Sequence, residues 1–210
     1  MALVYYELGE SLEAIALLEK AEKLSPKDVD IKKNLSIVYC SIGDIEKAEK
    51  YLEMIPNRND EITGLRGRIA FKKKDYKTAY NYLKNTEPMF YEDNFYLMLK
   101  ESMLELGKET ELYTFLNDTY EKYYDKKDFI ILYCTSLSEV FNETDFAIKT
   151  VMRYISQYGG DDDLFIFLSN LYLKNNEREN AVNSFKMVSR DNEYNKEYIE
   201  LKNKIRDTDN

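Results

Sequence analysis

The sequence predicts an all-α protein built from a repeated pair of helices. Glycine (7) and proline (3) are scarce among its 210 residues, which argues against a turn-dense β fold. Apolar residues recur three and four positions apart along most of the chain, as on the buried face of a helix. One position, usually alanine, also recurs at intervals of 34, 31, 33, 35 and 34 residues: Ala14, Ala48, Ala79, Leu112, Ala147 and Ala181. A helical chain without internal repeats would not keep this spacing.

The first unit is expected to be incomplete. Residues 1–8 form a short apolar helix that Gly9 breaks, and a second helix follows until Ser25 and Pro26, where proline cannot continue it. The unit, at about 1–28, lacks the first few residues of its first helix. Either the chain starts there naturally or it was cut from a longer protein.

The next five units are expected at about residues 29–59, 60–92, 93–126, 128–161 and 162–191. The unit at 29–59 is the clearest: Leu35 and Val38 mark its first helix, and Gly43 and Asp44 form its turn. Glycine there is free to take a left-handed conformation, while aspartate caps the following helix. Pro56 ends the unit.

A last helix is expected within residues 192–210. Tyr194, Tyr198, Leu201 and Ile205 fall on one of its faces, and charged residues occupy the others. This pattern predicts a capping helix, followed by a tail, that shields the final unit of the 1–190 array from water. The N-terminal end shows no comparable cap, which makes it a candidate surface for self-association.

The unit at 162–191 carries a recognisable motif. Its residues FIFLSNLYLKNNERENAVNSF have the spacing aromatic-x2-Leu-small-x2-Tyr, then a polar turn and Ala-x3-Phe, at Phe165, Leu168, Ser169, Tyr172, Ala181 and Phe185. This resembles the tetratricopeptide repeat (TPR), with Phe for Trp and Ser for Gly. The resemblance extends over about six repeats, the first truncated. It implies a TPR-like α-solenoid, a right-handed superhelix of antiparallel helix pairs with a concave groove lined by the first helix of each pair.

The resemblance also implies which residues line that groove. The sixth, ninth and twelfth places of each unit would face it, and the candidates for partner contact are Asn34, Arg68, Phe71, Met98, Glu101, Tyr133, Phe167 and Asn170. Such a lining is more apolar and aromatic than charged, and it suits a peptide anchored by hydrophobic side chains. In the alternative interpretation, Phe71, Met98, Tyr133 and Phe167 pack between neighbouring repeats instead.

The residue types argue against catalysis and cofactors. Histidine is absent, so Ser-His and Cys-His nucleophile systems are excluded. Cys40 and Cys134 lie far apart in apolar helical stretches and are expected to be buried free thiols, not zinc ligands. The run Asp161–Asp163 can be a metal-binding cluster, but it is more typical of a solvated loop leading into a helix. We therefore expect a protein that is not an enzyme and holds no cofactor.

The charge balance restricts the partners. Asp and Glu number 39 against 30 Lys and Arg, and the net charge of −9 disfavours direct nucleic-acid binding. No apolar run is long enough to cross a membrane, and the N-terminal residues lack a signal-peptide pattern, so a cytoplasmic location is expected. The sequence thus predicts a scaffold that binds a peptide or protein segment in its groove. The alternatives are a peptide-sensing domain of a larger regulator and a structural module that assembles end to end.

Overall fold

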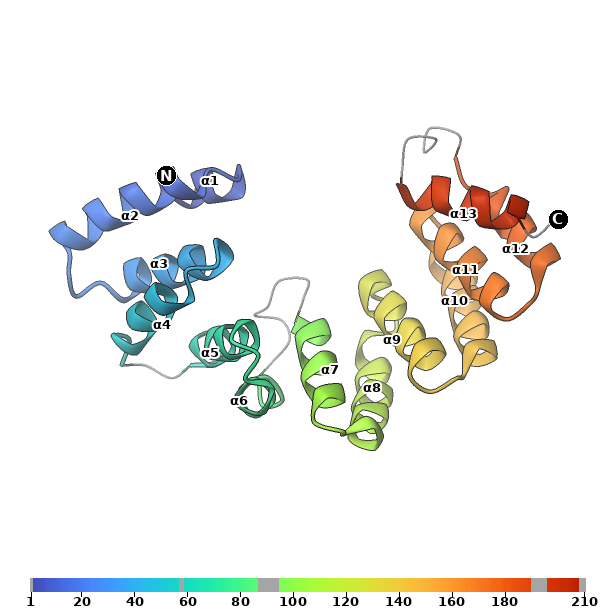
Figure 1. Cartoon of the computed structure of the whole chain (residues 1–210), viewed down its shortest axis with the longest axis horizontal. Coiled ribbons are helices and arrows are strands. Elements are labelled where there is room, and N and C mark those ends of the chain that lie inside the picture. Colours follow the sequence, from blue (N-terminus) through green and yellow to red (C-terminus); the bar gives the residue numbers. More distant parts are fainter. Residues whose placement is uncertain (1, 57–58, 87–94, 190–195, 208–210) are drawn as a thin grey trace. The chain divides into compact units, whose positions relative to one another are not determined.

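The computed structural model describes residues 2–56, 59–86, 95–189 and 196–207, and within these ranges its regular secondary structure is entirely α-helical (Figure 1). The all-α prediction is therefore confirmed. The chain divides into two compact units, Met1–Leu112 and Tyr113–Asn210. The dividing point falls inside α8, which spans Glu109–Tyr123. The expected repeat boundaries near residues 92 and 191 lie outside the described residues.

The first unit consists of consecutive helices that pack as neighbouring pairs. Its helices are α1 (Ala2–Glu7), α2 (Ser11–Leu24), α3 (Val29–Ser41), α4 (Ile45–Glu53), α5 (Asp60–Lys72), α6 (Tyr76–Leu83) and α7 (Phe95–Glu105). Helices α1 and α2, α3 and α4, and α5 and α6 form hairpins, and each hairpin packs on the next through its neighbouring helices. The core therefore runs continuously along the unit from Ala14 to Ile69.

The second unit follows the same plan and ends in a single helix. It contains α9 (Lys127–Glu139), α10 (Thr144–Tyr158), α11 (Asp162–Lys174), α12 (Arg178–Phe185) and α13 (Lys196–Asp207). Helix α13 packs on α11 and α12, where Tyr198 and Leu201 join Ile166 and Val188 in a buried cluster. This contact gives α13 the capping position that its amphipathic pattern predicts, although the expected contact residue Tyr194 lies outside the described residues.

The turns inside the hairpins share one backbone feature. A residue with positive φ occurs five positions before each recurrent alanine place, at Gly9, Gly43, Lys74, Gly107, Asn142 and Asn176. The backbone conformation of the turn therefore repeats with the same period as the alanines. Side chains then cap α4 and α6, where Asp44 accepts a hydrogen bond from the Lys47 amide at 3.2 Å and Asp75 accepts one from the Thr78 amide at 3.1 Å.

Small residues let the two helices of a pair approach closely. Ser36 and Ala48 are both fully buried, and the Ser36 hydroxyl donates to the Ala48 carbonyl oxygen at 2.8 Å. In the next pair, a Cβ atom on Gly67 would lie 2.6 Å from Cδ2 of Leu83. These contacts explain why Ser36, Ala48 and Gly67 are small.

Candidate protein-binding groove

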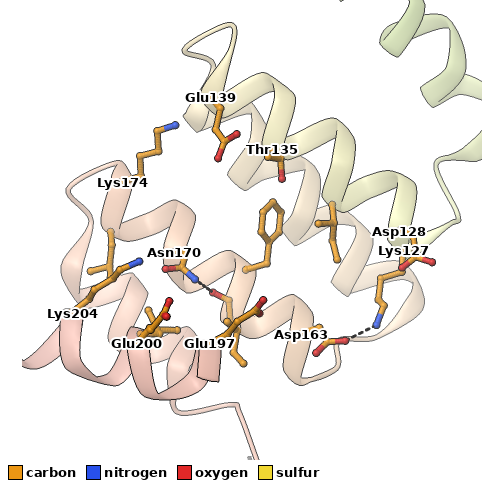
Figure 2. Close-up of a pocket in the computed structure, with 15 residues that line it drawn as sticks. Lys127, Asp128, Thr135, Glu139, Asp163, Asn170, Lys174, Glu197, Glu200 and Lys204 are labelled. Carbon is orange, nitrogen blue, oxygen red and sulfur yellow. Dashed lines mark hydrogen bonds and ion pairs between the residues drawn. The ribbon is translucent and has the colours of Figure 1, made fainter. Parts of the chain in front are cut away.

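A cavity of about 970 Å³ lies in the second unit between α9, α11 and α13 (Figure 2). Two first helices of repeats and the capping helix therefore form its walls. Helix α9 contributes acidic and apolar side chains, α11 contributes most of the floor, and α13 contributes two glutamates and a lysine. The lining consists of Lys127, Asp128, Ile131, Thr135, Glu139, Asp163, Ile166, Phe167, Asn170, Leu173, Lys174, Glu197, Glu200, Leu201 and Lys204. We call this cavity the α9–α11–α13 groove.

Helical spacing explains how these side chains reach the same cavity. On α9 the groove residues are Asp128, Ile131, Thr135 and Glu139, which follow one another at intervals of three or four positions. On α11 the intervals from Asp163 through Phe167, Asn170 and Lys174 are of the same kind. Residues so spaced share one face of a helix. Two parallel stripes of mixed apolar and polar side chains therefore border the groove.

An ion cluster closes one end of the groove, at the start of α9 and α11. The Lys127 ammonium contacts Asp161 Oδ2 at 2.7 Å and Asp163 Oδ2 at 3.0 Å. The bonds to Asp161 and Asp163 raise the pKa of Lys127 above its ordinary value. Burial alone would raise the pKa of Asp161, but the bonds from Lys127 and from the Leu164 amide hold it below its ordinary value. Asp161 is also the N-cap residue of α11, so the acidic run at 161–163 stabilises the start of that helix.

Other hydrogen bonds fix polar groups along the groove. The Lys174 ammonium donates to the Ser138 carbonyl oxygen at 2.7 Å, which joins the far ends of α11 and α9. Asn170 donates from Nδ2 to the Ile166 carbonyl oxygen at 3.1 Å, one turn earlier on its own helix (Figure 2). The lysines at both ends are therefore used in part to hold the two helices together.

The groove combines an apolar floor with an acidic rim. Five carboxylates line it, from Asp128, Glu139, Asp163, Glu197 and Glu200, against the ammonium groups of Lys127, Lys174 and Lys204. The apolar part comes from Ile131, Ile166, Phe167, Leu173 and Leu201. Such an arrangement can hold apolar side chains in its centre and attract positive charge at its edge.

Of the eight residues predicted to contact a partner, Phe167 and Asn170 line this groove. Tyr133 does not, because its side chain is only 2% exposed and its hydroxyl donates to Asn117 Oδ1 at 2.6 Å. Its ring also stacks with Tyr120, with ring centroids 4.8 Å apart. The placement of Tyr133 on the groove surface is therefore wrong, and Thr135 lines the groove instead.

One extra residue in the turn between α9 and α10 explains the error. The Glu143 amide donates to the Leu137 carbonyl, six residues earlier, at 2.8 Å. The matching bonds in other repeats, such as Glu177 to Tyr172 at 2.8 Å, span only five residues. Counting backwards from Ala147 therefore shifts every position on α9 by one residue. Tyr133 occupies the core place that Leu168 fills on α11.

The other five predicted residues belong to the first unit. Asn34 on α3 and Arg68 and Phe71 on α5 are half-buried, and Glu101 on α7 is exposed. Met98 is only 8% exposed, so it is mainly a core residue of α7. Phe71 packs its ring edge-on against Tyr76, with centroids 5.9 Å apart. A role of these residues in binding remains a prediction.

Sequence reasoning missed the α13 wall because the helix was interpreted only as a cap. Glu197, Glu200 and Lys204 surround the core residue Leu201 at helical spacing, and this pattern could have placed them beside the α11 face. It also missed Ile131 and Thr135, whose positions depend on the extra turn residue. A cap that packs on a first helix necessarily borders the groove next to it.

The described ranges contain no group of three or more His, Cys, Asp or Glu residues placed to bind a metal ion. Cys40 and Cys134 are buried free thiols, as predicted, and burial raises the pKa of Cys134 above its ordinary value.

Every helix in the described segments is too short or too polar to cross a membrane.

Repeated helix pairs, with a groove along their first helices, are typical of α-solenoid repeat proteins. Residues 5–69 match the family model for the tetratricopeptide repeat. The TPR repeat-containing protein YvcD of Bacillus subtilis (strain 168) is 26% identical over 163 residues, which cover 74% of this chain and 33% of YvcD. The chain thus spans about a third of the length of that relative.

Solved structures show the same fold. The pilus biogenesis factor PilW aligns with a TM-score of 0.74 at 13% identity, over 95% of this chain and 94% of PilW. PilF of Pseudomonas aeruginosa aligns with a TM-score of 0.67 at 17% identity, over 96% of this chain and 93% of PilF. YrrB, described as a TPR protein with an unusual peptide-binding site, aligns with a TM-score of 0.56 at 15% identity, over 91% of this chain and 97% of YrrB. Residues 5–69 thus match the tetratricopeptide repeat, and the fold of the chain is that of tetratricopeptide repeat proteins, which typically mediate protein–protein interactions.

Proposed function

We propose that the chain is a non-enzymatic scaffold that binds a segment of a protein partner in the α9–α11–α13 groove. The observation that carries this proposal is the half-buried Phe167 at the floor of a 970 Å³ cavity with a charged rim. Apolar anchors in the centre and polar groups at the edge are the usual anatomy of a protein–protein contact.

The groove is large enough for a short segment as the ligand. Its volume of about 970 Å³ lies at the upper end of the range of about 300–1,000 Å³ for sites that enclose small molecules. Here three helices border the cavity, and the carboxylates of Glu139 and Glu200 lie on opposite sides of it (Figure 2). A few turns of an amphipathic helix, or an extended strand, would cover this floor. The peptide-binding site named for YrrB is consistent with this use of the fold.

The test uses peptides selected from a displayed random library against the purified chain. Phe167→Asp places a charge on the floor and should weaken the selected peptides about 30-fold, because central aromatic anchors carry about 2 kcal/mol or more of binding energy. Phe167→Ala serves as the milder variant. The measurement is fluorescence anisotropy, with helicity checked by circular dichroism.

The control is Phe146→Asp. Phe146 is 45% exposed on α10 and does not line the groove. Affinity should be unchanged in this variant. Equal losses in the two variants, or no loss from either Phe167 substitution, would contradict the proposal.

Exposed leucines at the other end of the chain favour a second role, self-association. Leu8 after α1 is 70% exposed and Leu12 on α2 is 73% exposed. A second copy of the chain that covered these side chains would remove apolar surface from water. Sedimentation equilibrium should then show dimers for the native chain and monomers for Leu8→Glu/Leu12→Glu. A native chain that stays monomeric at all concentrations would refute this role.

A further inference from the structure

The capping helix forms one wall of the groove as well as closing the core. Its groove residues Glu197, Glu200, Leu201 and Lys204 follow one another at intervals of three, one and three positions, on one face of α13. Leu201 is 1% exposed and packs with Ile166 and Val188. The acidic side chains are therefore carried by a helix whose position is set by buried contacts.

A hydrogen bond further anchors the same helix. Arg178 on α12 donates from a guanidinium nitrogen to the Ile205 carbonyl oxygen of α13 at 3.0 Å. Charged donors near a helix C-terminus satisfy carbonyl groups that the helix leaves unpaired. With Leu201 in the core and Ile205 tied to α12, the α13 wall is held at two points within its last two turns. Glu197 and Glu200 are thus presented on a supported surface.

The side chains that line the groove carry more negative than positive charge. The charge of Lys127 is matched by Asp161 and Asp163. Asp128, Glu139, Glu197 and Glu200 also line the groove, together with Lys174 and Lys204. Glu200 contacts Lys196 at 3.7 Å, but that lysine is 89% exposed, and such surface pairs contribute little. The rim therefore attracts cations and disfavours acidic ligands.

We infer that the α13 wall makes the groove selective for a basic amphipathic segment of a protein partner. Apolar side chains of that segment pack on Phe167 and its neighbours, while its lysine or arginine residues lie along Glu197 and Glu200. This inference rests on the proposed function, since it needs the groove to be the binding site. The capping helix, which lies outside the repeats, would thus set the selectivity of the groove for the charge of the partner.

The test uses three synthetic peptides, each about 14 residues long, or about 20 Å as a helix. They share the same leucine stripe, and their polar positions are all lysine, all glutamine or all glutamate. The variant Glu197→Lys/Glu200→Lys reverses the charge of the wall. The control Glu121→Lys/Glu179→Lys makes the same change in net charge at two exposed residues of the same unit that do not line the groove.

The lysine peptide should bind the native chain more tightly than the glutamine peptide, and the glutamate peptide should bind least. The wall variant should weaken the lysine peptide about tenfold and leave the glutamine peptide unchanged. The control variant should weaken the lysine peptide by about twofold at most, through screened long-range attraction. Equal losses in the wall and control variants, or none in the wall variant, would overturn the inference.

Phe167→Asp and Phe167→Ala separate this inference from the function on which it rests. If they weaken the lysine and glutamine peptides alike while the wall variant changes nothing, the groove is the site and only the role of α13 is wrong. If they change neither peptide, or if neither peptide binds the native chain, both the proposed function and the inference are wrong. Anisotropy titrations at two salt concentrations give all of these readouts.

Discussion

Ser169 on α11 donates its hydroxyl hydrogen to the carbonyl oxygen of Ala181 on α12 at 3.0 Å, and both residues are fully buried. The same bond joins Ser36 and Ala48 at 2.8 Å in the first unit. A small hydroxyl side chain thus meets a small partner where the helices cross. The bond joins the first helix to the second through the carbonyl of the alanine at the crossing.

Ala181→Leu should therefore destabilise the second unit by about 1–3 kcal/mol, because the larger side chain forces α11 and α12 apart. Ser169→Ala should cost only about 1 kcal/mol, the loss of one buried hydrogen bond. Urea unfolding followed by circular dichroism measures both. Ala16→Leu, at an exposed position on α2, is the control and should change little. A tolerated leucine at 181 would refute the close-packing explanation.

Lys74 has a left-handed backbone, with φ of 60°, at a place where other repeats use Gly43 and Gly107. Lysine is strained there, because a Cβ atom disfavours positive φ, while glycine is not. Lys74→Gly should therefore raise the free energy of unfolding of the first unit, by about 0.5–1 kcal/mol. Lys72→Gly, at the end of α5, should lower it instead. Thermal melts compare the two, and a destabilised Lys74→Gly variant would contradict the prediction.

Tyr133 should matter for stability and have no direct part in binding. Removing its hydroxyl in Tyr133→Phe loses the bond to Asn117 and should cost about 1 kcal/mol. Tyr133→Ala should cost about 3–5 kcal/mol through the cavity it leaves. Peptide affinity of Tyr133→Phe should equal that of the native chain. A selective loss of affinity without a loss of stability would restore Tyr133 to the binding surface.

The Lys127 cluster predicts a pH-dependent contribution to stability. The pKa of Asp161 is lowered from 3.8, so its contribution is present above that value and is lost as the pH falls through the lowered pKa. The pKa of Lys127 is raised from 10.5, so its contribution is present below that value and is lost as the pH rises through the raised pKa. Lys127→Met should be less stable than the native chain by up to about 1 kcal/mol at neutral pH, since these groups are partly exposed.

The difference between the native chain and Lys127→Met should shrink as the pH falls through the lowered pKa of Asp161. Chemical unfolding at several pH values measures it. Lys126→Met is the control, because that lysine contacts only the neighbouring Asp125 among the ion pairs described, at 3.2 Å. A difference that stayed constant between neutral and acidic pH would show that the cost of Lys127→Met arises from packing.

The repeat period and the turns could be predicted from the sequence because they depend on local chemistry. A small residue at Ala48 and a glycine at Gly43 serve requirements that act within one hairpin, and these recur visibly. The all-α fold and the capping position of α13 follow from the same period and from one amphipathic face. Phe167 and Asn170 line the cavity at the places expected for them because their repeat keeps the regular frame, and their role in binding remains a prediction.

The register of α9 could not be predicted, because residue types alone do not reveal the extra residue in its turn. Cys134, Thr135 and Ser136 are all small, so any of them could meet Ala147 at the helix crossing. The six-residue bond from Glu143 to Leu137 decides between them, and it exists only in the folded turn. The sequence alone left open whether Met98 packs between repeats; its 8% exposure depends on how α7 packs, which its position in a repeat does not specify.

Chemical-shift mapping of the isotope-labelled chain with the lysine peptide tests the central claim most directly. Binding in the α9–α11–α13 groove predicts the largest amide shifts around Thr135, Phe167, Asn170 and Leu201, with small shifts at Phe146 on α10. The largest shifts elsewhere, as around the exposed Leu8 and Leu12 at the N-terminal end, would contradict the proposal that this groove binds the partner.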